Sequence, residues 1–291
     1  MDFTRSFVRA KSPCAEGFRW FLRNHQDGSD YQQVLDSLVA AGRIEDACWL
    51  LTQFGPTNTV LQLDAIDADA VVFAGAIEVR GNIEVAGIVR AGRSIRAGGG
   101  IRAGTAVVAG GDIRVDGSIT TEGKLQAGGD IRADWGVQVE HSVECGGGLK
   151  VGRDFTCGGS VTVGGNLLVA NDLVAKGVVE CGHGLRVGGR VVTEESIRAV
   201  RGIQCGGSIE CGMHLEAGSG VRVGADLLAG GAIRAGESLL VGGELRAGPG
   251  YGVFAGLCVQ RQVWESSARI TARLRPAELM SGWWAGPEAA A

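Results

Sequence analysis

One repeat constrains this chain more than any other feature of its sequence. From Val71 to Val263 every sixth residue is aliphatic or aromatic, and a smaller residue of inward-facing type follows it two positions later. The position between the two is mostly polar, and one or two glycines usually come next. Helices have an apolar period of 3.6 residues, so this pattern excludes them. Each unit predicts a three-residue strand, with its ends inward and its centre outward, followed by a corner.

Units of this kind stack because none of them buries enough apolar surface alone. Three units would close a triangular coil of 18 residues. We therefore expect an all-β solenoid, a three-sided parallel β-helix of about eleven coils and roughly 50 Å in length. Many of the 50 glycines follow the strand triplets, where we expect them to supply positive φ at the corners. A narrow lumen also explains why 45% hydrophobic residues coexist with only 5% aromatic ones.

The two ends of the chain differ from the repeat. Apolar residues at helical spacing predict three short helices within residues 13–56. Because the open edges of a solenoid pair with other chains unless covered, we expect these helices to cap the first coil. The Trp-rich tail is expected to fold back over the last coil. The resulting domains are an α-helical N-terminal cap at 1–56, a lead-in at 57–70, the β-helix at 71–263 and a C-terminal tail at 264–291.

Composition limits location and redox chemistry. The net charge is −4, and there is neither an 18-residue apolar run nor a signal-peptide pattern near Met1, which favours a cytoplasmic protein that does not enter a membrane. Five of the eight cysteines occupy the second inward position of a repeat, so we interpret them as reduced thiols that act as small hydrophobic side chains. These are Cys145, Cys157, Cys181, Cys205 and Cys211.

The sequence gives little support to an enzyme. Hexapeptide-repeat acyltransferases share such repeats, but they use an active-site histidine and often a loop that leaves the coil. Here His141 and His183 fall at corners of different sides, and the unbroken register leaves no room for such a loop. The acidic residues of the corners, such as Asp112 and Asp130, are interpreted as solvated turns. We therefore expect no catalytic residues, cofactor, metal site or small-molecule substrate.

The outward positions are more informative. Sorted by the 18-residue period, one face carries Glu78, Arg96, Arg114, Arg132, Lys150, Leu168, Arg186, Gln204, Arg222 and Leu240. Like charges at strand spacing repel, so such a row needs local counter-charges or an anionic partner. Local acids are available at Asp112, Asp116, Asp130 and Asp134. The alternative is an acidic protein, and the negative net charge disfavours nucleic acid.

Trp135 interrupts the corner pattern beside that face. It stands where Gly117 stands one coil earlier, and Arg153 follows one coil later. Two interpretations remain open: a stack of Arg153 on Trp135 that joins two coils, or an exposed aromatic anchor for a partner. The predicted partner-binding residues are therefore Arg96, Arg114, Arg132, Trp135, Lys150, Arg153 and Arg186.

The repeat resembles the bactofilin, or polymer-forming cytoskeletal, domain of bacteria. The resemblance covers residues 71–263 and is carried by strings such as Gly-Gly-Asp-Ile-Arg-Val-Asp-Gly-Ser-Ile at 110–119 and Gly-Gly-Ala-Ile-Arg-Ala-Gly at 230–236. It implies a β-helix that joins end to end into filaments, although the helical start and the Trp-rich tail depart from the family. Two function classes follow. One is a binding module for another protein, such as an inhibitor, an immunity protein or a scaffold, and the other is a self-assembling structural protein.

Overall fold

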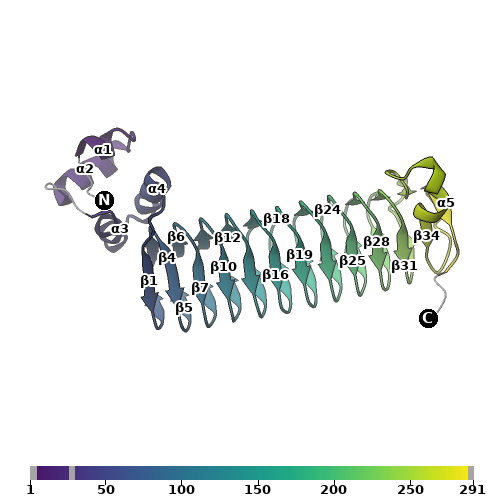
Figure 1. The fold of residues 1–291 in the computed structure, drawn as a ribbon, viewed down its shortest axis with the longest axis horizontal. Helices are drawn as coiled ribbons and strands as arrows, with labels where there is room; N and C mark the ends of the chain where they lie inside the picture. Colours follow the sequence, from purple (N-terminus) through teal and green to yellow (C-terminus); the bar gives the residue numbers. More distant parts are fainter. Residues whose placement is uncertain (1–4, 26–29, 288–291) are drawn as a thin grey trace.

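The computed structural model describes residues 5–25 and 30–287 and has the shape of a long rod with a helical domain at its N-terminal end (Figure 1). Short parallel strands stack into three sheets of 13, 11 and 12 strands, which make about twelve turns. Corresponding residues of successive regular turns are 18 positions apart. The three-sided β-helix and the length of its coil are therefore confirmed.

The strands alternate in chain order between the sheets, here called sheets 1, 2 and 3. Sheet 1 consists of β1 (Val60–Leu63), β4 (Ala76–Val79), β7 (Ile95–Ala97), β10 (Ile113–Val115), β13 (Ile131–Ala133), β16 (Leu149–Val151), β19 (Leu167–Val169), β22 (Leu185–Val187), β25 (Ile203–Cys205), β28 (Val221–Val223), β31 (Leu239–Val241), β34 (Arg269–Thr271) and β36 (Trp283–Trp284). Sheet 2 consists of β2 (Ile66–Ala68), β5 (Ile83–Val85), β8 (Ile101–Ala103), β11 (Ile119–Thr121), β14 (Val137–Val139), β17 (Phe155–Cys157), β20 (Leu173–Ala175), β23 (Val191–Thr193), β26 (Ile209–Cys211), β29 (Leu227–Ala229) and β32 (Leu245–Arg246). Sheet 3 consists of β3 (Val71–Phe73), β6 (Ile88–Ala91), β9 (Ala106–Ala109), β12 (Lys124–Ala127), β15 (Val143–Cys145), β18 (Val161–Val163), β21 (Val179–Cys181), β24 (Ile197–Ala199), β27 (Leu215–Ala217), β30 (Ile233–Ala235), β33 (Val253–Phe254) and β35 (Leu279–Ser281).

The helical domain contains the three expected helices and one more. They are α1 (Arg5–Arg9), α2 (Ala15–Asn24), α3 (Tyr31–Ala40) and α4 (Ile44–Phe54). The apolar faces of α3 and α4 form a small core with Val72 and Ala74 of the first turn. The helical domain is thus joined to the rod by packed side chains as well as by the chain itself.

Gln32 of α3 hydrogen-bonds to the backbone at β3, the first strand of sheet 3. Its side-chain Nε2 donates to the carbonyl of Val72 at 3.0 Å, and its Oε1 accepts from the amide of Ala74 at 2.9 Å. These are the two groups to which a further strand would bond. The first strand of sheet 1 lacks this cover, because Val60 and Leu63 of β1 are exposed. Contacts of the helices with the first turn are therefore concentrated on one of its three strands.

The lumen is filled by the two inward residues of each strand, which form one continuous apolar core. Cys145, Val163 and Cys181 follow one another in one inward column, as the spacing predicted. Burial raises the pKa of the Cys181 and Cys211 thiols to about 12 and that of Cys205 to about 11. These side chains are therefore protonated at neutral pH and pack as small hydrophobic groups.

The expected reason for the corner glycines was wrong. In the described part of the chain, the glycines with positive φ all lie outside the stretch 57–245. Glycine is favoured at many corners because successive turns approach closely there, although other turns hold residues such as Asp116 or Val200 at the equivalent position. A Cβ added at Gly110 would lie 2.2 Å from the carbonyl oxygen of Gly92, and one at Gly146 would lie 2.3 Å from that of Gly128. A side chain at Gly110 or Gly146 would therefore require the stacked corner to shift.

The extent of the regular repeat also needs correction. The lead-in already forms β1 and β2, so the first turn begins before Val71. At the other end the spacing stops at Leu245, and Tyr251, Leu257 and Val263 are exposed rather than inward. A turn at 248–251 lengthens the chain there, so that Ile233 pairs with Val253.

The tail folds over the last regular turn, as expected. A 3-10 turn (Arg261–Val263) precedes it, and the tail itself contains α5 (Trp264–Ser267) and three strands. Strands β34 and β36 extend sheet 1, and β35 extends sheet 3. Trp284 packs against the core of the rod. None of the helices within the described ranges is long and apolar enough to cross a membrane.

Candidate protein-binding face

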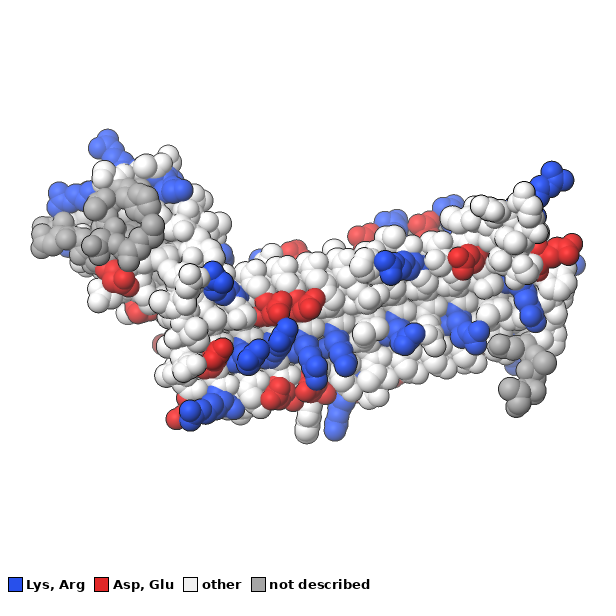
Figure 2. All heavy atoms as spheres, in the orientation of Figure 1, with Lys and Arg blue, Asp and Glu red and all other residues white. Residues whose placement is uncertain are grey.

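The basic residues of sheet 1 form an in-register row. Arg114 pairs with Arg96 on one side and with Arg132 on the other, and Arg132 pairs with Lys150. Successive side chains therefore leave the sheet at strand spacing, roughly 4.8 Å apart. Figure 2 shows this row running along β7 to β16, with acidic groups on both sides. We call these four residues the basic row, and their alignment is as the sequence predicted.

Local counter-charges reach only the middle of the basic row. Arg114 is 3.1 Å from the Asp112 carboxylate, two residues before it, and Arg132 is 2.8 Å from that of Asp134, two residues after it. The second contact lowers the pKa of Asp134, because its carboxylate accepts a hydrogen bond from the Arg132 guanidinium. Because outward residues alternate along a strand, only the positions two before and two after a row member can supply such an acid within its own turn.

The other basic residues of sheet 1 have no acid at those positions. Lys150 lies between Gly148 and Gly152, and Arg96 lies between Ser94 and Gly98. Arg186 and Arg222 are likewise flanked by glycines. Among the residues that the structure describes, none of these four basic side chains is within 4.0 Å of a carboxylate. Local ion pairs therefore form at Arg114 and Arg132 but not at the ends of the row, where Arg96 has only its in-register neighbour Glu78 of the preceding turn.

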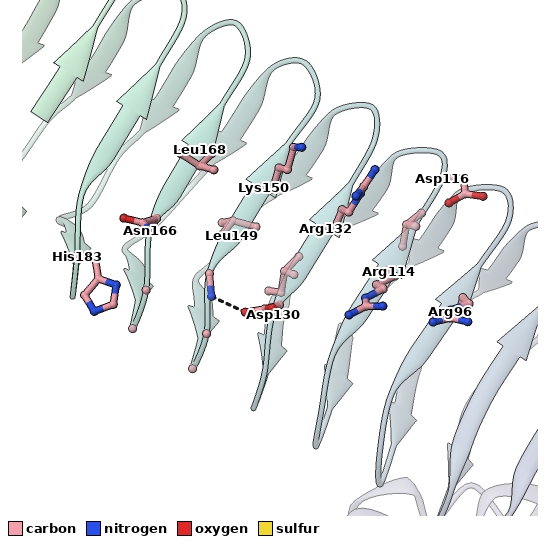
Figure 3. Close-up of a pocket in the computed structure, with 17 residues that line it drawn as sticks. Arg96, Arg114, Asp116, Asp130, Arg132, Leu149, Lys150, Asn166, Leu168 and His183 are labelled. Atoms are coloured by element: carbon pink, nitrogen blue, oxygen red, sulfur yellow. Dashed lines mark hydrogen bonds between the residues drawn. The ribbon is translucent and has the colours of Figure 1, made fainter.

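The basic row lies along an open groove of about 910 Å³ (Figure 3). Its floor contains the glycines at 146–148 and 164–165, and Asn166, Leu168 and His183 continue it toward the C-terminal end. Arg186 lines a neighbouring groove of about 580 Å³ together with Gln204 and Arg222. The structure thus brings together Arg96, Arg114, Arg132 and Lys150, while Arg186 belongs to the continuation of the same face.

Trp135 and Arg153 lie apart from this groove. Trp135 is at the corner where the chain passes from sheet 1 to sheet 2, and it lines a hollow of sheet 2 beside Arg102 and Thr120. The Arg153 guanidinium stacks over the Trp135 ring, 4.4 Å from its centroid, so the predicted stack is present. The ring is still 53% exposed and remains available to a partner that extends around the corner.

Sheet 3 handles its outward charges differently. Arg198 lies between Glu180 and Glu216 of the neighbouring turns, 3.1 Å and 3.7 Å from their carboxylates. Arg234 is 2.9 Å from Glu216. Opposite charges alternate along this column and neutralise one another between turns. The same-sign row of sheet 1 is therefore not a requirement of the fold.

Acidic and amide side chains at the corners bond to the next turn. Asp112 Oδ1 accepts the amide of Asp130 at 3.0 Å, and Asp130 Oδ1 accepts the amide of Gly148 at 2.7 Å, which Figure 3 shows as a dashed line. Asn166 Oδ1 accepts the amide of Gly184 in the same way. These corner residues are thus specific hydrogen-bond acceptors, where the sequence had suggested solvated turns. The sequence signal for these bonds is an Asp or Asn directly before a strand. Its side chain accepts a hydrogen bond from the backbone N–H of the residue 18 positions later.

The histidines do not converge. His141 follows β14, where its Nδ1 lies 2.8 Å from the carbonyl of Glu122, and His183 follows β21 at a different corner. His214 Nδ1 accepts the amide of Ala232 at 3.0 Å. Throughout the described ranges, no group of three or more His, Cys, Asp and Glu side chains has an arrangement that could hold a metal ion.

Comparison with known proteins adds one observation. Residues 1–54 match the family model described as the YdhT N-terminal domain, and the match ends at the last residue of α4. The search of the curated proteins gave no significant match. The search of the solved structures gave none either. The helical domain is therefore similar to a domain with its own family model, whereas the rod is characterised here by its parallel β-solenoid fold.

Proposed function

We propose that this chain is a non-enzymatic binding module whose sheet 1 docks an acidic segment of another protein. The proposal depends on the basic row itself, which lies in register along a groove and whose end members, Arg96 and Lys150, form no ion pair within the described residues, although Glu78 of the preceding turn pairs in register with Arg96. Stacked strands hold these charges in place before a partner arrives. Binding therefore requires little ordering of the backbone, which reduces its entropic cost.

The surroundings of the row favour a protein segment over nucleic acid. The carboxylates of Asp116 and Asp130 also line the groove, so only a narrow strip of positive charge is presented. The broad phosphate surface of a duplex would meet these acids, and the net charge of −4 would oppose its approach. An extended acidic peptide could follow the strip and remain clear of them. Complementary charge would also speed its association.

The proposal can be tested with a fluorescein-labelled polyglutamate peptide and a matched polylysine peptide. Fluorescence anisotropy should show binding of polyglutamate at low ionic strength, weakening steeply as salt is added. Polylysine should not bind with comparable affinity. Equal affinity for the two peptides, or no binding of polyglutamate, would remove acidic recognition by sheet 1.

A second candidate is bactofilin-like assembly through the ends of the rod. It is favoured by the exposed strand β1 at one end and by exposed Met280 and Trp283 at the other. Uncovered strand edges and apolar side chains promote contact between copies. Light scattering and negative-stain microscopy distinguish the two functions, since filaments that form without any partner would support assembly and a concentration-independent monomer would support the binding module.

A further inference from the structure

The corner at Gly148 lies in the groove of the basic row and lacks a hydrogen-bond acceptor that other corners have. Elsewhere on the rod an Asp or Asn directly before a strand accepts the amide of the residue 18 positions later. Gly148 occupies that position before β16 but has no side chain with which to accept. Accordingly, no hydrogen bond donated by the Asn166 amide is found among the described residues.

Space for a carboxylate is retained at this corner. A Cβ on Gly129 or Gly147 would lie 2.2 Å from the Asp112 or Asp130 oxygen that the preceding turn places there. Glycine at these positions therefore makes room for the carboxylate. Gly165 is the equivalent residue after Gly148, and it is glycine although the chain places no acid over it. The Gly148 corner, defined by Gly148, Gly165, Lys150 and the Asn166 amide, thus keeps the room but lacks the acceptor.

Asp112 shows how a carboxylate sits in such a corner. One oxygen accepts the amide of Asp130 at 3.0 Å, while the other accepts from the guanidinium of Arg114 at 3.1 Å. Arg114 is two residues after Asp112, as Lys150 is two residues after Gly148. Lys150 has no ion pair within the described part of the chain, and Figure 3 shows its ammonium turned away from the corner. Its four-carbon side chain is flexible enough to turn back toward an anion.

We propose that the Gly148 corner binds one carboxylate of the acidic partner. This carboxylate accepts a hydrogen bond from the backbone N–H of Asn166 and forms an ion pair with Lys150. This inference rests on the proposed function and names the contact that fixes the position of the partner. The neighbouring carboxylate of Asp130 does not prevent it, because Asp112 and Asp130 already occupy adjacent corners of the same column. The charge of Asp130 is also partly offset by its hydrogen bond from the Gly148 amide.

Gly100 offers a matched comparison on sheet 2. It too directly precedes a strand, is followed by an arginine two residues later, and has a glycine, Gly117, at the equivalent position of the next turn. Here, however, Arg102 pairs in register with Glu84 of the preceding turn, so an incoming carboxylate would face an acid. An added Cβ would lie 3.4 Å from the Asn166 carbonyl oxygen at Gly148 and 3.2 Å from the Ser118 carbonyl oxygen at Gly100. Both corners can therefore hold a small side chain with little adjustment.

The test uses substitutions that fill the corner without changing charge. In Gly148→Asn, the side-chain oxygen of the new asparagine should accept a hydrogen bond from the backbone N–H of Asn166, as the Asn166 side chain does from Gly184. This should weaken polyglutamate binding by about tenfold in the anisotropy assay. Gly100→Asn is the control and should leave the affinity unchanged. Thermal unfolding of both variants checks that each one folds. Wild-type binding together with an unaltered Gly148→Asn variant would overturn the corner contact and leave the proposed function standing.

A measurement on the wild-type protein keeps the test independent of how the variants fold. In a nitrogen-15 spectrum, the Asn166 amide resonance should move on addition of polyglutamate, more than that of Ser118 at the control corner. If polyglutamate binds and the Asn166 resonance stays in place, the contact is wrong. If polyglutamate does not bind at all, the proposed function fails first and the corner contact fails with it.

Discussion

Sheets 1 and 3 enclose one lumen and share one coil length, yet their outward charges are arranged in opposite ways. On sheet 3, Arg198 lies between Glu180 and Glu216 and forms an ion pair with each of them. On sheet 1, Arg96, Arg114, Arg132 and Lys150 stack with the same sign. The comparison separates two kinds of constraint. Inward residues are set by the fold, while the outward positions are free to differ, so the same-sign row on sheet 1 is not imposed by the fold.

The largest effect should come from placing a charged side chain at an inward position of sheet 1. Ile113 is fully buried, and Ile113→Asp would place a carboxylate in the apolar lumen, beside the outward Arg114. We expect a loss of at least about 4 kcal/mol in the free energy of unfolding, measured by urea denaturation. Arg114→Gln should change it by less than about 1 kcal/mol. Similar losses for the two variants would mean that outward residues also determine the fold.

The lumen also predicts a pH dependence that both faces share. Burial raises the pKa of Cys181, Cys205 and Cys211 above the ordinary value of 9.0, so these thiols lose protons first in the unfolded chain. The contribution of these thiols to stability should therefore be present below pH 9 and be lost as the pH rises from 9 toward about 11 for Cys205 and about 12 for Cys181 and Cys211. At one pH unit above 9, each thiol should cost about 1.4 kcal/mol.

Alanine provides the control for this alkaline loss. It already occupies the next turn of the same columns at Ala199 and Ala229, so it is compatible with the lumen. A variant with alanine in place of Cys181, Cys205 and Cys211 should show a smaller decrease in unfolding free energy between pH 8 and pH 10 than the wild type. An unchanged decrease would assign the alkaline effect to other groups.

Trp135 tests the corner at the edge of sheet 1. Trp135→Ala removes the stack with Arg153 and should cost about 1 kcal/mol of unfolding free energy. Because Trp135 lies outside the groove of the basic row, polyglutamate affinity should change by less than about twofold. A large loss of affinity would extend the binding face around the corner onto sheet 2.

The smallest expected effects have opposite signs on the two faces. Arg198→Gln on sheet 3 breaks two ion pairs and should lower the unfolding free energy by about 0.5 kcal/mol. Lys150→Gln on sheet 1 removes repulsion from Arg132 and should raise the unfolding free energy by about 0.3 kcal/mol. Both changes should shrink in high salt. Effects of the same sign would contradict the difference between attractive charge pairs on sheet 3 and repulsive ones on sheet 1.

The sequence predicted the parts of this structure that depend on period. The 18-residue column of Arg96, Arg114 and Arg132 follows from the same spacing that fills the lumen, so both were visible before the fold was known. The end of the repeat was not, because Tyr251 satisfies the apolar pattern by chance after the chain has left the register. The apolar pattern alone does not indicate the turn that lengthens the chain before Val253.

The finer features of the candidate site depend on contacts between turns. Which acid pairs with which base could not be read from spacing, since Arg132 has an aspartate on both sides and contacts Asp134. The hydrogen bond from the Gly148 amide to Asp130 requires the three-dimensional register of neighbouring corners. The contacts of Gln32 with Val72 and Ala74 join segments 40 and 42 residues apart, which no local pattern indicates.

We propose that the ends of the basic row of sheet 1, Arg96 and Lys150, and not positive charge in general, bind an acidic partner. The most direct measurement is polyglutamate anisotropy on two variants with the same net charge, Arg96→Gln with Lys150→Gln on sheet 1, and Arg198→Gln with Arg234→Gln on sheet 3. We expect the sheet 1 variant to bind about tenfold more weakly than the wild type and the affinity of the sheet 3 variant to stay within about twofold of the wild type. Equal losses in the two variants would contradict this proposal.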